Sequence, residues 1–257
     1  MARAQVIAQW LDALLRTSEI PDYPGALNGL QLTSRKEILR LACAVDFSTH
    51  TVREAARVAA DMLLVHHGMF WGGARPLTGA VYEQLAALIG SDIAVYSSHL
   101  PLDLHPEVGN NVLLARQLGI EPSGGFARFK TVDVGVSGIS DVSTSTLVDR
   151  ARAFARGLGG KVVATPFLPH RRTLRWGICT GAGAASDTIR EALQSGIDTM
   201  IVGEGPHHTA VQARDVGIVI VYAGHYATET LGVRALARRA AEEFGLEAQF
   251  LDAPTGL

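Results

Sequence analysis

Residues 62–68 read MLLVHHG, an apolar run that stops on two adjacent histidines and a glycine. Successive side chains on a strand point to opposite faces, so a regular strand cannot aim His66 and His67 at one point. Either one histidine is incidental, or the chain breaks at Gly68 and both rings serve a site just beyond a strand that ends at Val65. The rest of the sequence has to decide between these interpretations.

Two further predicted strands run into the same kinds of side chain. His99 and Asp103 follow one of them, and His225 and Glu229 follow the other. Ligands of α/β sheets bind beyond the carboxyl ends of strands, where all three groups lie. His225 and Glu229 are also four residues apart where a helix begins, which puts both on one face. Imidazoles and carboxylates suit Zn, Mn or Fe, and ligand softness does not choose among these metals.

The adjacent histidines point to a pair of metal ions. They cannot easily chelate one ion, but each can bind its own if two ions lie side by side, with a carboxylate such as Glu229 between them. Divalent ions about 3.5–4 Å apart are a recurring hydrolytic device that holds a water and the substrate oxygen. His99 is either a ligand or a residue that supports the ligands. The isolated His50, His105 and His170 are interpreted as loop or surface residues.

Alternating helices and strands indicate an α/β fold with largely parallel pairing. Helical periodicity is present at 3–15, 48–60, 80–89, 110–118, 144–157, 186–195 and 228–244. The predicted strands are LRLACAV, DMLLV, DIAVYS, TVDVGVSG, KVVATPF, LRWGICT, DTMIV and GIVIVYA. Pro and Gly interrupt the pattern at 119–130, which predicts a first α/β domain over 1–124 and a second over 125–257.

Composition excludes several classes of protein. The chain has 257 residues, of which 47% are hydrophobic and 19% charged, as in a globular protein. A net charge of -2 without a long Lys/Arg run argues against nucleic-acid binding, and no apolar stretch is long enough to span a membrane. Cys43 and Cys179 lie far apart in apolar contexts, as buried free thiols do. With an N-terminus unlike a signal peptide, these features predict a cytoplasmic protein.

The chain also repeats itself. Residues 51–68 align without gaps to 188–205, and seven of the 18 positions are identical, including Thr51/Thr188, Asp61/Asp198 and Gly68/Gly205. Further along, VYSSHLPLD (95–103) matches VYAGHYATE (221–229). Two matches in the same order predict two similar α/β halves that arose by internal duplication.

Several motifs together resemble one family. They are NGLQL (28–32), AVDFST (44–49), LLVHHG (63–68), HLPLDLHPEVGNN (99–111), CTGAGAAS (179–186), VGEGPHH (202–208) and GHYATE (224–229). They are similar to those of the Nif-three-like dinuclear metal-centre proteins, which are also called type 2 GTP cyclohydrolase I. The resemblance runs from about residue 28 to 240, and the length is that of the short bacterial branch.

The resemblance implies a ligand set, an assembly and an activity. It implies two divalent metal ions per chain, held between two similar α/β domains by His66, His67, Asp103, His225 and Glu229. It also implies a ring-shaped homohexamer and hydrolytic opening of a small-molecule substrate, GTP. If the site is hydrolytic, we expect His99 to shuttle a proton. Glu204 stands where many members carry an aspartate, and the family's nearby lysine is missing. A metal-delivery protein and a ring-shaped scaffold remain alternatives to the hydrolase.

Four weaker signals lie close to these motifs. Amides around Gly181 could meet a phosphate, but a tight turn with Ser186 capping the next helix is the favoured interpretation. Asp46 and Ser48–Thr49 are candidates to cap the helix that starts near Thr51, and Asp46 is alternatively interpreted as facing the metals. Phe70 and Trp71 could stack a base, although core packing is favoured for both.

Overall fold

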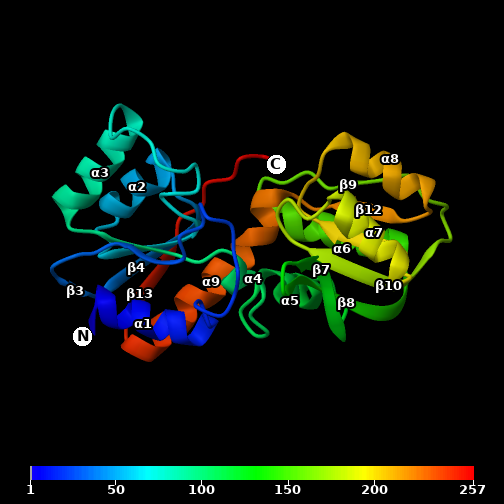
Figure 1. Cartoon of the computed structure of the whole chain (residues 1–257), viewed down its shortest axis with the longest axis horizontal. Coiled ribbons are helices and arrows are strands. Elements are labelled where there is room, and N and C mark those ends of the chain that lie inside the picture. The colour runs from blue at the N-terminus through cyan, green and yellow to red at the C-terminus, as the bar shows by residue number, and fades with distance from the viewer. Residues whose placement is uncertain (1) are drawn as a thin grey trace. The chain divides into compact units, whose positions relative to one another are not determined.

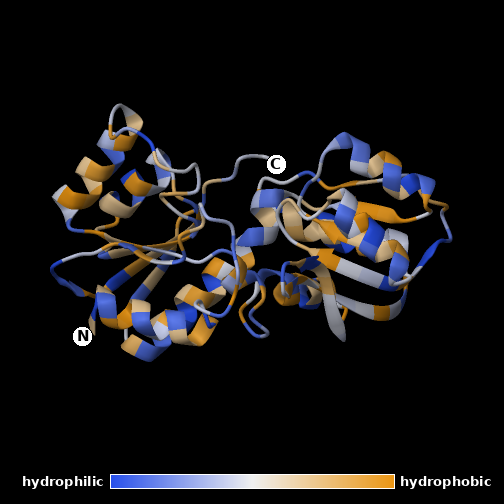
Figure 2. Cartoon of the chain, in the orientation of Figure 1, coloured by the Kyte–Doolittle hydropathy of each residue, from blue (hydrophilic) through white to orange (hydrophobic). Residues whose placement is uncertain are grey.

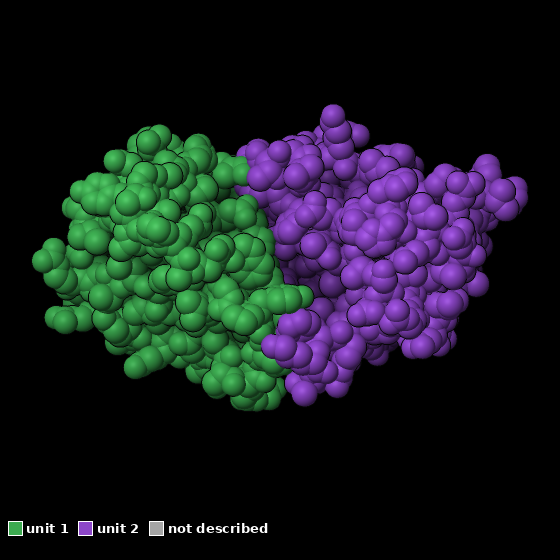
Figure 3. Space-filling view, turned by 45° about the horizontal axis from the view of Figure 1, so that its top comes forward, with its two compact units in different colours: residues 1–102, 232–253 green, residues 103–231, 254–257 purple. Residues whose placement is uncertain are grey.

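The computed structural model describes residues 2–257, which divide into two compact units (Figure 3). Unit 1 comprises the residues up to Leu102 together with Gly232–Ala253. Unit 2 comprises Asp103–Leu231 and Pro254–Leu257. This division differs from the boundary expected at residue 124, because the chain changes unit at Asp103 and returns to unit 1 after residue 231.

Unit 1 is built from a mixed sheet and covering helices. Its elements are β1 (Ala2–Arg3), α1 (Ala4–Leu15), β2 (Gly29–Leu32), β3 (Glu37–Ile38), β4 (Arg40–Asp46), α2 (Thr49–Arg57), β5 (Met62–His67), α3 (Ala80–Ser91), β6 (Ala94–Ser97), α4 (Leu100–Asp103, whose last residue belongs to unit 2) and β13 (Glu247–Phe250). Helix α9 (His225–Phe244) belongs to unit 1 from Gly232 onward.

The main sheet of unit 1 has the strand order β13-β4-β5-β6-β2. Strands β13, β4, β5 and β6 are parallel, and β2 is antiparallel to β6. In Figure 1, α2 and α3 lie on one side of this sheet, and α1 and the unit 1 part of α9 lie on the other. Alternate strand residues such as Leu63 and Val65 pack with Val52 and Leu88 of the two covering helices. Burial on both faces explains why these strands are apolar runs (Figure 2).

Unit 2 is also built from a mixed sheet and covering helices. Its elements are α5 (Asn110–Gln117), β7 (Gly124–Phe129), β8 (Val132–Ser143), α6 (Thr144–Arg156), β9 (Val163–Ala164), β10 (Arg172–Cys179), α7 (Ser186–Gln194), β11 (Thr199–Val202), α8 (His207–Asp215), β12 (Val219–Tyr222) and the start of α9. The strand order is β7-β8-β10-β11-β12-β9, in which β10, β11 and β12 are parallel and the others antiparallel.

Alternation along these strands separates two hydrophobic cores in unit 2. Ile201 and Val221 face the helices α5 and α6, whereas Met200, Val202 and Ile220 face α7 and α8. Successive side chains of a strand point to opposite faces, so one short strand contributes to both cores. The alternating α/β pattern of the sequence is thereby confirmed as a mixed α/β fold.

The structure corrects some local expectations. Helix α9 begins at His225 rather than at residue 228, and α8 was not expected. Strand β5 continues two residues beyond the predicted end at Val65, so both histidines belong to it. Its ladder with β6 stops at Val65, whereas its ladder with β4 continues to the pair Asp46 and His67. In the described part of the chain, no helix is both long and apolar enough to cross a membrane.

Candidate metal centre

Three histidines gather in unit 1 where β5 and β6 end. The rings of His66 and His67 lie 4.8 Å apart, centroid to centroid, and the His99 ring lies 4.9 Å from His66 and 5.6 Å from His67. One ring nitrogen from each histidine lies within 4.8 Å of the other two. All three side chains are buried, at 0% exposed for His66 and 8% for the others. The two adjacent histidines therefore serve one site, although both lie in a strand.

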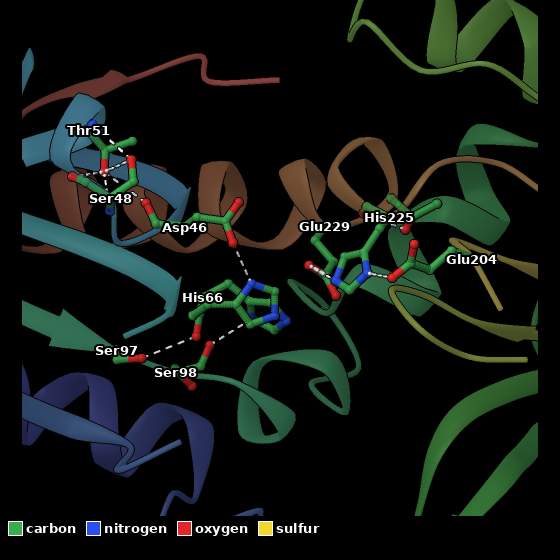
Figure 4. Close-up of polar contacts among 11 residues, drawn as sticks. Asp46, Ser48, Thr51, His66, Ser97, Ser98, Glu204, His225 and Glu229 are labelled. Atoms are coloured by element: carbon green, nitrogen blue, oxygen red, sulfur yellow. Dashed lines mark hydrogen bonds and ion pairs between the residues drawn. The ribbon is translucent and has the colours of Figure 1, made fainter. Parts of the chain in front are cut away.

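Each of these rings is oriented through its Nδ1 atom. His66 Nδ1 lies 2.9 Å from the carbonyl oxygen of Ser98, and Figure 4 draws this contact as a dashed line. His67 Nδ1 lies 2.8 Å from Asp46 Oδ1, and His99 Nδ1 lies 2.9 Å from Asp22 Oδ1. A carbonyl only accepts, so His66 Nδ1 carries the proton and its acceptor lone pair is on Nε2. This arrangement of carbonyl or carboxylate behind each imidazole is typical of metal-ligating histidines.

The partner of His99 is held by a small polar network. Asp22 Oδ2 accepts hydrogen bonds from Asn28 Nδ2 at 2.8 Å and from the amide of Leu100 at 2.9 Å, while Asn28 Oδ1 accepts from the amide of His99 at 2.7 Å. Burial raises the pKa of Asp22, but the hydrogen bonds from His99, Asn28 and Tyr23 outweigh it and leave the pKa below its usual value. Asp22 is therefore an ionised carboxylate that fixes His99 from behind.

Asp46 does not cap the following helix. The N-cap of α2 is Ser48, whose hydroxyl accepts from the amide of Thr51 at 3.2 Å. The Asp46 carboxylate turns instead to His67. Of the two expectations for Asp46, the structure supports the one in which it faces the candidate site.

Unit 2 brings another histidine and two carboxylates together at the start of α9. His225 Nδ1 lies 2.8 Å from Glu204 Oε1, and His225 Nε2 lies 3.2 Å from Glu229 Oε2 (Figure 4). Burial lowers the pKa of His225, but the hydrogen bonds and charges of Glu229 and Glu204 outweigh it and raise the pKa to about 9. Glu204 thus orients His225 as Asp46 orients His67.

Two glycines allow these side chains to pack closely. Gly181 has a φ of +61°, and a Cβ at this position would collide with Glu229 Oε1. Its amide donates to Thr228 Oγ1 at 3.1 Å rather than pointing to a phosphate. A Cβ on Gly203 would lie 2.8 Å from His225 Cα. The turn interpretation of this segment is supported, but the N-cap of α7 is Ala185, not Ser186, whose hydroxyl donates to Gln212.

Asp103 lies in unit 2, at the end of α4. It is 8% exposed, and its Oδ1 accepts a hydrogen bond from Asn110 Nδ2 at 2.8 Å. Burial raises the pKa of the nearby Cys179 thiol to about 12, helped by the charges of Asp103, Glu229 and Glu191. The Cys179 thiol therefore stays protonated at neutral pH. Cys43 is also free and buried, so both predicted buried thiols are confirmed.

Two cavities of unit 1 lie apart from the histidines. One of about 320 Å³ is lined mainly by apolar side chains that include Phe47, Met69, Phe70 and Leu77, with Arg75 at its edge. Another of about 420 Å³ lies between α9 and β13 and is lined by Arg234 and Arg238 among others. Neither lining contains a histidine.

The donors of each unit, taken separately, are imidazoles and carboxylates, which suit divalent ions such as Zn, Mn and Fe. Imidazole nitrogens come from unit 1, a further imidazole and carboxylates come from unit 2, and each of His66, His67, His99 and His225 is braced through Nδ1. Sequence reasoning found these histidines but did not single out Asp22 or Asn28. Asp22 lies 77 residues from His99, and no local motif announces the pairing.

Fold and site define a class of mixed α/β proteins with histidine and carboxylate groups at strand ends that can hold metal. A family model described as Duf34/NIF3 (NGG1p interacting factor 3) matches residues 2–255, and the chain belongs to this family. The resemblance seen in the sequence motifs is thereby confirmed.

Individual relatives match along nearly all or all of their length. A protein of Deinococcus radiodurans named GTP cyclohydrolase 1 type 2 homolog is 39% identical over 253 residues, which cover 98% of this chain and 93% of the relative. A protein of the same name from Pyrococcus abyssi is 37% identical over 268 residues, covering 100% of both. A solved structure titled protein ybgI, unknown function, superposes with a TM-score of 0.89 at 33% identity, covering 100% of both chains.

Proposed function

We propose that this protein binds two divalent metal ions per chain and is a metal-dependent hydrolase that acts on a nucleotide. The observation that carries the proposal is the group of three buried histidines, whose ring nitrogens lie within 4.8 Å of one another. Burying three imidazoles side by side is unfavourable if they become charged, and it is a common arrangement where neutral rings bind metal. The bracing of His66 by Ser98 and of His67 by Asp46 supports the same role.

The ligand assignment draws on both units. We assign the ions to His66, His67, Asp103, His225 and Glu229. A buried carboxylate such as Glu229, 3% exposed, suits a position between two cations because it costs less to bury when its charge is neutralised. Bound divalent ions would polarise a substrate oxygen and lower the pKa of a water to about 7. Asp46 and Glu204 hold the rings of His67 and His225 in place for this task.

His99 is the residue that we assign to proton transfer. Asp22 accepts from its Nδ1, so the neutral ring carries its lone pair on Nε2 and can take up a proton there. Asp22 then stabilises the cation that forms. The amide of His99 is anchored to Asn28, which keeps the ring in one position through the transfer.

The substrate that we propose is GTP, supported by the names of the relatives and by family membership. Addition of one water to the carbon between the two nitrogens of guanine's five-membered ring breaks one carbon–nitrogen bond and leaves a formamide. A second water breaks the remaining bond and releases that carbon as formate. Each freed nitrogen takes up a proton, and no oxidant or reductant is needed. His99 is placed to move these protons.

The test is to incubate metal-loaded protein with GTP and to measure formate and the loss of guanine absorbance. His66→Ala should abolish both signals, because it removes a buried ring of the cluster. His170→Ala is the matched control, since His170 is exposed, and it should leave both unchanged. A wild-type protein that binds two metal equivalents but releases no formate would overturn the hydrolase and favour metal delivery.

We also propose that the chain assembles as a ring-shaped homohexamer, on the basis of its family alone. Light scattering with size-exclusion chromatography should give a mass near six chains of 27.3 kDa. A monomer at micromolar concentration would refute the ring and leave the metal site untouched.

A further inference from the structure

Two large aromatic side chains stand exposed beside the buried histidines of unit 1. Trp71 is 41% exposed and Tyr23 is 50% exposed. Trp71 nevertheless contacts the site, with its ring centroid 4.4 Å from that of His99 and 4.9 Å from that of His67. Core packing, the favoured interpretation of Trp71 from the sequence, is therefore wrong. The exposure of the Trp71 and Tyr23 rings beside the buried histidines therefore needs an explanation other than core packing.

The position of Trp71 is fixed by its backbone and not by burial of its ring. The preceding amide of Met69 donates to Gln31 Oε1 at 2.7 Å, and Gln31 Nε2 donates to the carbonyl of Leu27 at 3.0 Å. On the other side, a Cβ added to Gly25 would lie 2.9 Å from the Trp71 carbonyl oxygen, so only glycine lets this segment approach. The indole is thus held against the histidines while part of it remains open to solvent.

We propose that Trp71 is a platform on which the planar heteroaromatic ring of the substrate stacks, with Tyr23 contacting the edge of that ring. The proposal deepens the nucleotide hydrolase proposed above and rests on it. The Trp71 and Tyr23 rings lie 6.4 Å apart at 78°, too close to perpendicular for both to stack on one ligand. A ring seated on the indole lies next to His99 and His67, because the indole itself contacts both.

A stacked purine suits this surface better than the neighbouring apolar cavity does. Stacking on an aromatic face accepts any base, and its loss weakens binding about 5- to 150-fold. The cavity of about 320 Å³ is lined by Phe70, which is 37% exposed, and not by Trp71 or a histidine. A ring bound in that cavity would contact Phe70 and lie away from the proton-transfer residue His99. Phe70 is therefore the matched control for Trp71.

The test measures binding of guanosine to metal-free protein by calorimetry, with ribose 5-phosphate as a ligand that lacks the ring. We expect guanosine to bind wild-type protein and ribose 5-phosphate to bind much more weakly. Trp71→Ala should weaken guanosine binding at least about fivefold, Trp71→Phe should restore most of it, and Phe70→Ala should stay within about twofold of wild type. Circular dichroism confirms that each variant is folded.

Two results would overturn the platform: guanosine affinity unchanged in Trp71→Ala, or affinity lost in Phe70→Ala instead. A wild-type protein that fails to bind guanosine at millimolar concentration overturns it as well. Formate release measured in parallel separates the two proposals. Loss of guanosine binding in Trp71→Ala without formate release by wild type supports the platform and contradicts the hydrolase. Formate release by wild type with no effect of Trp71→Ala on guanosine binding supports the hydrolase and contradicts the platform.

Discussion

The segments 49–68 and 186–205 use the same hydrogen bonds to build the same frame but end in different chemistry. Asp61 Oδ2 accepts from the amides of Leu39 and Arg40, and the repeat residue Asp198 accepts in the same way from Leu174 and Arg175. At the strand ends, His66 and His67 correspond to Gly203 and Glu204. The Glu204 carboxylate contacts His225 Nδ1 and orients that ring, whereas the ring of His67 is oriented by the carboxylate of Asp46.

This difference shows how one backbone arrangement, fixed by the hydrogen bonds of Asp61 and Asp198, can carry different side chains at its strand end. The shared bonds lie at the start of the strand and in the preceding turn, where they fix the backbone. The exchanged side chains lie at the last residues, where a substitution changes the site without changing the frame. The matching order of β4-β5-β6 and β10-β11-β12 supports the internal duplication, which stays a prediction until the two halves are superposed.

The largest expected effect separates the donors of the two units. Glu229→Ala should lose both metal ions, because the proposed bridging carboxylate is removed. His67→Ala should lose mainly one, because it removes a ligand of a single ion. Elemental analysis of protein purified without chelator should give about two equivalents for wild type. A fully loaded Glu229→Ala protein would contradict the bridging role.

A smaller effect is expected from Gly181→Ala. The new Cβ would press on Glu229 Oε1, and the positive φ adds backbone strain of about 1–2 kcal/mol. Gly73→Ala is the matched control, because Gly73 has a φ of +75° but open space around its Cβ position. Gly181→Ala should therefore lose more stability in urea than Gly73→Ala and should also bind less metal. Equal losses in the two variants would show that packing against Glu229 does not matter.

The hydrogen bonds that the two segments share can be removed by substituting Asp61 or Asp198. Asp61→Asn should cost about 1–3 kcal/mol of unfolding free energy at neutral pH, because two backbone amides lose a charged acceptor. Burial raises the pKa of Asp61, but Lys36 and the Leu39 and Arg40 amides outweigh it and lower the pKa. This stabilisation is therefore present above the unfolded pKa of about 3.9 and is lost as pH falls through the lower folded value.

Urea titrations of Asp61→Asn at several pH values check this prediction, with Asp198→Asn as its partner in the repeat. The two variants should lose similar stability at neutral pH if the frame is shared. A loss for Asp61→Asn that persists undiminished in acid would rule out an electrostatic origin.

The smallest effect concerns the helix caps, where the two segments differ. Ser48 caps α2 through its hydroxyl, whereas the corresponding N-cap of α7, Ala185, has no side-chain acceptor. Ser48→Ala should cost about 1 kcal/mol, and Ala185→Ser should gain up to about 1 kcal/mol. Thermal unfolding should show a lower melting temperature for Ser48→Ala and a higher one for Ala185→Ser than for wild type. Destabilisation by Ala185→Ser would mean that the N-terminus of α7 gains nothing from a hydroxyl at residue 185, because Thr188 already accepts from the Ala185 amide there.

The sequence predicted what depends on local pattern. Helices such as α1 and α3 follow from apolar spacing, and the strand-end histidines follow from the rule that α/β sites lie there. It did not predict α8, which is short and follows a proline. The pairing of Asp22 with His99 was also missed, because it forms only when residues 77 positions apart meet in the folded sheet. The exposure of Trp71 depends on the conformation of the loop between β5 and α3, which the sequence pattern does not predict.

Strand β13 has a consequence for the order of folding during synthesis. It pairs in parallel with β4, so the sheet of unit 1 gains its outer strand only after the whole of Asp103–Leu231 has been made. At about 5–20 residues per second, that interval is on the order of ten seconds. Throughout it, the edge of β4, whose Leu41 and Cys43 are buried in the finished protein, lacks the strand that covers it. Such an uncovered strand edge is a template for pairing with other chains, so unit 1 is exposed to misassembly until β13 has been made.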